Sequence, residues 1–369
     1  MTEYVKILVV EDTDDMFDLY ADQALDSSTD DLRISLVRAK TVAEGRTSLL
    51  SNEYDGAIVD LNLSQDNPLE ASGNDILLEI LEKHRFPVFV VSGNLTNLKH
   101  EIRTKESAFL KFFDRSVSNK DIFDGFIKIY DTGITKILGG RGLIEKQLSE
   151  IFWAHLSGDL ICNIAHQSEK ILLRHIVSHL LEYLDIPDEE VGYHESEFYI
   201  KPPIREHIAT GDLVKLNGEN FIVLSPACDI AVRNPGAEPP QINAERILLA
   251  PAISVNYQSF VKNGIIKAES KLGDRSGVLS EIIKGKRERY GFLPKYGSIS
   301  PSAVDFQNII TMPFAEFIKL ERIATISGVF MKDIQSRFAA YLGRQGQPDL
   351  DKKRLATEYK GLLDAETKS

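Results

Sequence analysis

Cysteine is nearly absent from this sequence: among 369 residues only Cys162 and Cys228 occur, and they lie far apart. Their separation excludes a disulfide framework and the short ligand spacings of a zinc site, and it favours a reducing compartment. The sequence also lacks an apolar run of the roughly 20 residues that a membrane-spanning helix needs. Its first residues have neither the basic start nor the cleavage site of a signal peptide. We therefore expect a cytoplasmic protein without a membrane partner.

Positive charge is scarcer than negative charge, with 43 Lys and Arg against 55 Asp and Glu and a formal net charge of -12. This imbalance argues against nucleic acid as a partner, because phosphate backbones attract basic surfaces. The run Lys284–Arg289 is a local exception that can grip phosphates, and the neighbouring Tyr290 and Phe292 can stack on bases. A solvated, charged helix end is the alternative interpretation, and the acidic background favours it. No helix-turn-helix pattern occurs in residues 190–369.

The first 130 or so residues alternate short apolar runs, rich in β-branched residues, with helical patterns. Such an alternation predicts an α/β domain with a doubly wound, five-stranded parallel sheet covered by helices on both faces. One of the helices begins with a capping box formed by Thr41 and Glu44. The five predicted strands are Lys6–Val10, Arg33–Val37, Gly56–Val59, Pro87–Val91 and Phe109–Phe113.

The rest of the chain has a different pattern. Apolar residues recur at helical spacing from about residue 140 to 184, which predicts a connector or a dimerisation hairpin. The stretch Gly211–Ser225 predicts a strand, a tight Asn-Gly turn and a second strand, and helical patterns return at Phe330–Leu342 and Leu350–Leu363. We therefore predict four segments: the doubly wound domain over 1–132, a helical connector over 133–187, a β-rich, mixed α/β domain over 188–348, and a helix or tail over 349–369.

Acidic residues follow the first and third predicted strands. Glu11 and Asp12 come after the first strand, and Asp60 comes after the third, with Asn62 two residues further on. Because the carboxyl ends of parallel strands meet at one edge of a sheet, we expect these side chains to lie together. Carboxylate and carbonyl oxygens are the ligands that Mg²⁺ prefers. Such an ion would offset the charges when a carboxylate attacks a phosphorus centre.

Residues 4 to about 130 resemble the receiver (CheY-like) domain of two-component response regulators from bacteria. The resemblance implies a flavodoxin-like fold and phosphorylation of Asp60 by a partner histidine kinase. It also implies that Asp12 and Asp60 bind Mg²⁺ directly, that Glu11 acts largely through water, and that Asn62 contributes its backbone carbonyl. Signalling would then pass to a downstream protein partner or effector, with homodimerisation left open.

The same resemblance assigns the switching residues. Ser92, after the fourth strand, takes the position of the switch serine or threonine, and Phe112 takes that of the switch aromatic. The family places a lysine and a proline after the fifth strand, whereas this sequence has Arg115 and a serine. We prefer Arg115 to Lys111 because Ser118 is then suitably placed to cap the last helix. Arginine keeps the positive charge but presents a planar fork in place of a compact ammonium.

The segment Gly211–Asp229 is loosely similar to the first hairpin of the SH3-like barrels of the MazF/PemK toxin ribonucleases. The polar, basic loop that supports RNA cleavage in that family is reduced here to Asn217–Asn220. Cys228 beside Asp229 is a candidate nucleophile, because a neighbouring base or positive group activates a thiol. A buried, structural cysteine is the alternative interpretation.

Two functions follow from these patterns. The favoured one is a response regulator of a two-component phosphorelay that changes its protein–protein contacts, as an adaptor, regulator or phosphate sink. Its only catalysis would be self-phosphotransfer and dephosphorylation. The alternative is a phospho-regulated effector enzyme whose C-terminal domain acts on RNA or uses Cys228.

Overall fold

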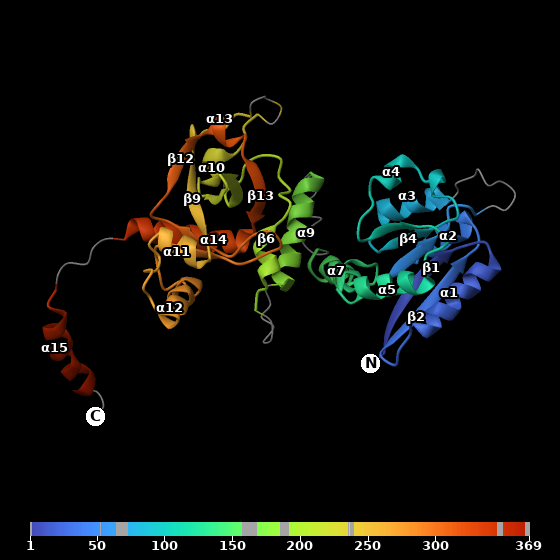
Figure 1. Cartoon of the computed structure of the whole chain (residues 1–369), viewed down its shortest axis with the longest axis horizontal. Coiled ribbons are helices and arrows are strands. Elements are labelled where there is room, and N and C mark those ends of the chain that lie inside the picture. Colours follow the sequence, from blue (N-terminus) through green and yellow to red (C-terminus); the bar gives the residue numbers. More distant parts are fainter. Residues whose placement is uncertain are drawn as a thin grey trace. The chain divides into compact units, whose positions relative to one another are not determined.

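The computed structural model describes residues 2–51, 53–63, 73–156, 168–184, 192–234, 236, 240–344 and 350–365. The chain divides into two compact units, residues 1–189 and residues 190–369, and each is considered by itself (Figure 1). Cys162 and the predicted segment boundaries near residues 187 and 348 lie outside the described residues. The division into four segments therefore stays a prediction. Among the described residues, no helix has the length and apolar character that a membrane crossing requires.

The first unit contains a sheet of five strands that all pair in parallel. Their order in space is β2-β1-β3-β4-β5, so the chain direction across the sheet reverses at β1. This confirms the predicted doubly wound sheet, and it is the order in which ligands sit beyond the carboxyl ends of β1 and β3. The strands are β1 (Glu3–Val10), β2 (Leu32–Ala39), β3 (Gly56–Val59), β4 (Val88–Val91) and β5 (Leu110–Phe113).

Helices cover both faces of this sheet (Figure 1). Along β1, Ile7 and Val9 pack into the core beneath α1 and α5, whereas Leu8 and Val10 pack into the core beneath α2, α3 and α4. Burial on both faces explains why the second half of this strand, Ile7–Val10, is continuously apolar. The helices are α1 (Asp14–Asp26), α2 (Val42–Leu49), α3 (Gly73–Lys83), the 3₁₀ turn η1 (Leu95–Asn97), α4 (His100–Arg103) and α5 (Asn119–Tyr130).

The helix starts follow the sequence signals only in part. Thr41 Oγ1 accepts the Glu44 amide hydrogen bond at 3.1 Å, as a capping box requires. The Glu44 carboxylate, however, accepts from the amide of Lys40 at 2.7 Å and not from that of Thr41. Ser118 stands at the N-cap of α5 as predicted, but its side chain makes no capping hydrogen bond. The sequence therefore located both helix starts without giving the full bonding.

The helical segment that follows also belongs to the first unit. Gly133, with φ of +76°, turns the chain from α5 into the next helix. The described helices here are α6 (Ile134–Leu138), α7 (Leu143–Glu150), the π-helical η2 (Ile151–Leu156) and α9 (Glu169–Leu184).

The second unit is built on an antiparallel sheet with the strand order β10-β11-β9-β8-β7-β13-β6, with β12 also pairing with β9. The predicted hairpin forms β7 and β8, and its turn residues Asn217 and Gly218 have φ of +50° and +83°. Two positive φ values are what the tight Asn-Gly turn requires. The strands are β6 (Tyr199–Ile200), β7 (Asp212–Leu216), β8 (Glu219–Val223), β9 (Arg246–Ser254), β10 (Tyr290–Leu293), β11 (Ser302–Asp305), β12 (Ile310–Pro313) and β13 (Glu321–Ile326).

The strand pairings place β10 and β6 at opposite ends of this order, so a closed SH3-like barrel stays a prediction. The longest described helix of the unit packs Met331, Ile334 and Tyr341 into the core beside the sheet. The helices are η3 (Glu195–Phe198), α10 (Ala227–Ile230), α11 (Tyr257–Lys262), α12 (Leu272–Ile283), α13 (Phe314–Phe317), α14 (Gly328–Gly343) and α15 (Lys352–Ala365).

Candidate phosphoacceptor site

Two buried carboxylates stand at the carboxyl ends of β1 and β3. Glu11 is 2% exposed and Asp60 is 1% exposed. The Asp60 amide donates to the carbonyl of Val10 at 3.0 Å, which ties the end of β3 to the end of β1. The parallel pairing of these strands therefore brings together two acidic residues that are far apart in the sequence.

Arg115 is the cation that reaches this edge. Its Nη2 donates to Asp60 Oδ2 at 2.6 Å and lies 4.0 Å from Glu11 Oε2. The Arg115 side chain is 41% exposed, so it bridges the buried carboxylates and the solvent. Lys111, the other cation considered from the sequence, has its ammonium 5.7 Å from the centre of the Phe89 ring. The structure thus places the cation of the predicted register on the proposed acceptor.

The surroundings of Glu11 disfavour its negative charge. Burial raises the pKa of the Glu11 carboxyl to about 6, and the nearby charge of Asp60 contributes to the rise. The Thr13 amide donates to Glu11 Oε1 at 3.0 Å and opposes the rise. Arg38 holds the main chain here, because its Nε and Nη2 donate to the carbonyls of Glu11 and Asp12 at 3.1 and 2.9 Å. Asp12 itself is half-buried.

The residues after β4 and β5 supply a hydroxyl and an aromatic ring. Ser92 is 0% exposed, and its Oγ has no hydrogen-bond partner among the described residues. A buried hydroxyl without a partner is costly, which suits a group that donates to an incoming oxygen. Phe112 is half-buried against the core beneath α3 and α4. The Asn62 amide donates to Asp60 Oδ1 at 3.3 Å.

Gly73 and Asn74, which no sequence motif indicated, position the main chain around Asp60 and Ser92. A Cβ on Gly73 would lie 2.2 Å from the Asp60 carbonyl oxygen and 2.7 Å from Leu61 Cα, so α3 begins directly against the main chain of Asp60. Asn74 is fully buried; its Nδ2 donates to the Asn97 carbonyl and its Oδ1 accepts from the Lys99 amide, both at 3.0 Å. These bonds fix the segment that follows Ser92. In the sequence, the only sign of this role is that a glycine and an asparagine stand together at the start of α3.

The donor chemistry of the site fits Mg²⁺, which takes hard oxygen ligands. Glu11 and Asp60 offer buried carboxylate oxygens, and Arg115 is their ion-pair partner among the described residues. Among the described residues, no three or more acidic, histidine or cysteine side chains form a group that could hold a metal ion. The Arg115 guanidinium donates a hydrogen bond to Asp60 Oδ2, and a bound metal ion would need this oxygen as a ligand.

No protein-family model matches this chain, and no curated protein matches it. Solved structures do. One receiver domain, from Methylobacillus flagellatus, is 15% identical, covers 34% of this chain and 99% of its own, and has a TM-score of 0.27. Another, from Methanospirillum hungatei JF-1, is 16% identical over 35% of this chain and 96% of its own, with a TM-score of 0.29.

The phosphorylated cyanobacterial phytochrome response regulator RcpA is 20% identical, covers 37% of this chain and 99% of its own, and has a TM-score of 0.28. The first two of these structures are described as CheY-like receiver domains. The three structures cover 34% to 37% of this chain. The strand order β2-β1-β3-β4-β5 of the first unit is the flavodoxin-like order of doubly wound sheets.

At the second candidate site, Asp229 is the side chain that bonds Cys228 among the described residues, and no described histidine is bonded to the thiol. Cys228 is exposed, so the interpretation as a buried cysteine is wrong. Its Sγ donates to Asp229 Oδ1 at 3.5 Å. His207 precedes the β7–β8 hairpin in the sequence, and its side chain lines a cavity together with Arg322. Cys228 does not belong to the described lining of that cavity. His194 is bonded to neighbours on its own turn, with Nδ1 2.9 Å from Ser196 Oγ.

Two of the four cations in the basic run at residues 284–289 form ion pairs within the unit. Arg289 makes a two-bond ion pair with the buried Asp305, at 2.8 and 2.6 Å. Arg287 pairs with Glu281 at 2.9 Å. Lys284 stands at the C-cap of α12. These contacts agree with the interpretation of the run as a charged helix end.

Proposed function

We propose that this chain is a response regulator in a two-component phosphorelay and that Asp60 accepts a phosphoryl group from a histidine kinase. The carrying observation is that a buried carboxylate at the end of β3 contacts a cation, Arg115, beside a second buried carboxylate, Glu11. An unpartnered hydroxyl, Ser92, is buried after the neighbouring strand. A carboxylate nucleophile, a cation and a free donor are the groups that phosphoryl transfer uses.

In the proposed reaction, a carboxylate oxygen of Asp60 attacks the phosphorus atom of a phosphohistidine. A phosphorus–oxygen bond forms while the phosphorus–nitrogen bond breaks, and the leaving imidazole keeps the electron pair and takes up a proton. Bound Mg²⁺ would be held by Glu11, Asp12, Asp60 and the Asn62 carbonyl, and it would supply positive charge against the phosphoryl oxygens.

The chain's own donors would hold the product. Arg115 carries a planar fork that can bind two phosphoryl oxygens at once. The Ser92 hydroxyl would gain the partner that it lacks among the described residues. Movement of Ser92 towards the phosphoryl group would open space for half-buried Phe112 to repack. Phosphorylation of Asp60 would thereby change the packing around Phe112, which lies beside α3 and α4.

An output through protein–protein contacts has support from α9. Leu173, Val177 and Leu181 are four residues apart along this helix and are all exposed. They form an apolar stripe that suits a downstream protein or a second copy of the chain. For the second unit we propose an interaction role built on an SH3-like element, supported by the β7–β8 hairpin. The environment of Cys228 gives the enzyme alternative no comparable support.

The direct test is to incubate the purified full-length chain with acetyl phosphate and Mg²⁺ and measure its intact mass. The wild type should gain one phosphoryl group, and Asp60→Ala should gain none. Asp131→Asn, at an exposed aspartate after α5, serves as the matched control and should behave as the wild type. No gain on the wild type, or equal gain on Asp60→Ala, would refute the proposal.

A further inference from the structure

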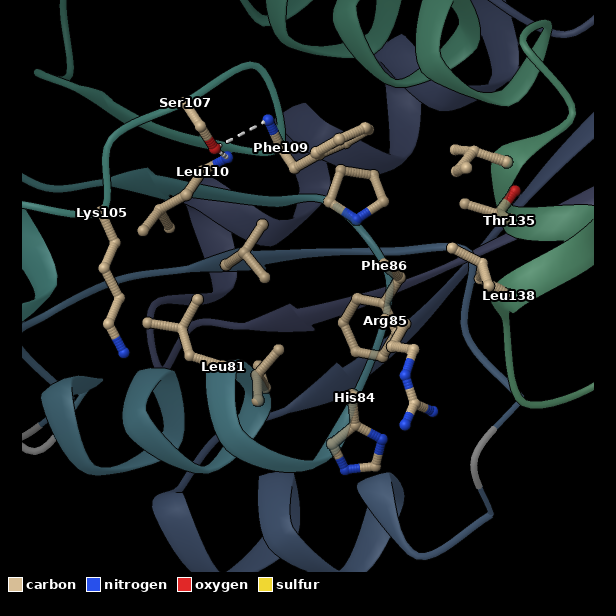
Figure 2. Close-up of a pocket in the computed structure, with 14 residues that line it drawn as sticks. Leu81, His84, Arg85, Phe86, Lys105, Ser107, Phe109, Leu110, Thr135 and Leu138 are labelled. Carbon is tan, nitrogen blue, oxygen red and sulfur yellow. Dashed lines mark hydrogen bonds between the residues drawn. The ribbon is translucent and has the colours of Figure 1, made fainter. Parts of the chain in front are cut away.

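The first unit contains a cavity of about 230 Å³ (Figure 2). It lies at the edge of the sheet opposite to Asp60. It is lined by Val88 and Leu110, the first residues of β4 and β5, whereas Asp60 and Ser92 follow the last residues of β3 and β4. The end of α3 forms another wall, and α6 closes a further side. The cavity is therefore separated from the acceptor by the full length of the strands.

The lining combines an apolar interior with a basic rim. Leu81, Phe86 and Leu138 are among the apolar side chains that face one another across it (Figure 2). Arg85 and Lys105 also line the cavity, both are exposed, and neither forms an ion pair with a described residue. No acidic residue belongs to the described lining. The described lining therefore carries two cations and no acidic side chain around an apolar space.

A polar group at the rim adds a directed contact. Ser107 Oγ accepts from the amides of Phe109 and Leu110, both at 3.3 Å, as Figure 2 shows. Among the described residues its own hydroxyl hydrogen has no recorded acceptor, so it can donate to a ligand oxygen. An oxygen anion on the Lys105–Ser107 side of the rim would thus have a neutral donor as well as a cation.

We propose that this cavity binds a small apolar carboxylate, with its ring or short acyl chain among the apolar side chains and its carboxylate on the side of the rim that Lys105 and Ser107 form, while Arg85 adds positive charge on another side (Figure 2). The volume lies below the roughly 300 Å³ at which drug-sized ligand pockets begin, which limits the ligand to about one ring with a short chain. An apolar body gains from leaving water, and the cations select an anion over a neutral analogue.

The ligand would act on α6. This helix contributes Ile134, Thr135 and Leu138 to the cavity and comes directly after α5. Its other side is already held, because Lys136 pairs with Glu3 at 2.7 Å and stands 4.6 Å from the centre of the Tyr130 ring. A bound carboxylate would brace α6 against the amino ends of β4 and β5. The first unit would then have a second input, independent of phosphorylation and placed where the connector begins.

The test is calorimetric titration of the full-length protein with 4-phenylbutyrate and with octanoate, using 4-phenylbutanol as the uncharged counterpart. At least one carboxylate should bind saturably with a stoichiometry of one, and the alcohol should bind more weakly. The double variant Arg85→Gln/Lys105→Gln changes only exposed side chains and should weaken carboxylate binding by about tenfold. The matched double variant Lys120→Gln/Lys128→Gln, at exposed lysines of α5, should keep the wild-type affinity.

Two further variants complete the design. Leu138→Trp should fill the cavity and abolish binding, and its circular dichroism spectrum should show an intact fold. Asp60→Ala should bind with wild-type affinity, so failure of the phosphoacceptor proposal leaves this one standing. Absence of saturable binding by both carboxylates would overturn the inference. Equal affinities in the Arg85/Lys105 variant and its lysine control would overturn it as well.

Discussion

Arg115 Nη2 donates to Asp60 Oδ2 at 2.6 Å, so the cation contacts the proposed acceptor before any phosphoryl group arrives. Asp60 is nearly fully buried, and an unpaired charge there would be costly. The same contact occupies an oxygen that both Mg²⁺ and a phosphorus centre would use. Arg115 therefore has two opposing effects: it stabilises the carboxylate and it competes with the groups that the carboxylate must meet.

Replacement of Arg115 by glutamine should separate these effects. In the variant, Mg²⁺ no longer has to displace the Arg115 guanidinium from Asp60 Oδ2, so the affinity of the protein for Mg²⁺ should rise. Phosphoryl uptake from acetyl phosphate should slow by about tenfold to a hundredfold, because a cation that stabilises the transferring group is lost. Mg²⁺ titration by calorimetry and time-resolved intact mass measure the two quantities. Lys111→Gln is the control and should change neither; a wild-type rate and Mg²⁺ affinity in Arg115→Gln would contradict the assignment.

The stability of the metal-free protein should depend on pH through Glu11. Its folded pKa is raised by burial from 4.5 to about 6, so between these values the folded state keeps a proton that the unfolded state has lost. Stability therefore falls as pH rises through this window, and the full cost, about 2 kcal/mol, is present above pH 6.

Glu11→Gln removes this titration and keeps the shape of the side chain. In chelator, the variant should be more stable than the wild type at pH 7 by up to about 2 kcal/mol, and the two should converge near pH 4. Urea unfolding at a series of pH values provides the comparison. A constant difference between the two proteins across this range would show that the burial of Glu11 does not control the effect.

Gly73 should tolerate no side chain, in contrast to Gly93. A Cβ at position 73 would meet main-chain atoms of Asp60 and Leu61 at 2.2 and 2.7 Å, which cannot swing away as a side chain does. Gly73→Ala should lower the free energy of unfolding by about 1–3 kcal/mol and slow phosphoryl uptake, because β3 or α3 must shift. A Cβ at Gly93 would have its nearest neighbour at 3.9 Å, so Gly93→Ala is the matched control. Equal stability of both variants would remove the steric argument.

The sequence predicted the first unit well because its signals are local. Most of the strands contain a short apolar run, and Glu11, Asp12 and the proposed acceptor Asp60 follow such runs directly. The order of the strands fits the doubly wound class that this alternation indicates. Arg115 also follows from a local signal, because Ser118 at the N-cap of α5 sets the register that selects it.

Other parts of the site could not be predicted because they depend on contacts between distant segments. Asn74 acts by bonding the main chain at Asn97 and Lys99, and a single asparagine gives no signal of such a partner. The second sheet shows the same limit on a larger scale. Its neighbouring strands β7 and β13 are separated by most of the unit, and no periodicity within either strand encodes that pairing.

The pairing of β7 with β13 carries a buried ion pair, and loss of one partner alone should strongly destabilise the second unit. Asp212 is 0% exposed and accepts from Arg322 Nε at 2.8 Å, from Thr325 Oγ1 at 2.6 Å and from the Ala209 amide at 2.8 Å. Removal of the arginine leaves a buried carboxylate without its counter-ion. Arg322→Ala should therefore lower the free energy of unfolding by about 3–5 kcal/mol.

The double variant Asp212→Leu/Arg322→Met tests the reason for this loss. It removes both charges, so it should recover most of the stability that Arg322→Ala loses. Arg354→Ala breaks an exposed pair with Glu358, whose side chains are 64% and 55% exposed, and it should cost less than about 1 kcal/mol. Urea denaturation followed by circular dichroism measures all three. If the double variant is as unstable as Arg322→Ala, the loss comes from packing around Arg322 and not from an uncompensated charge at Asp212.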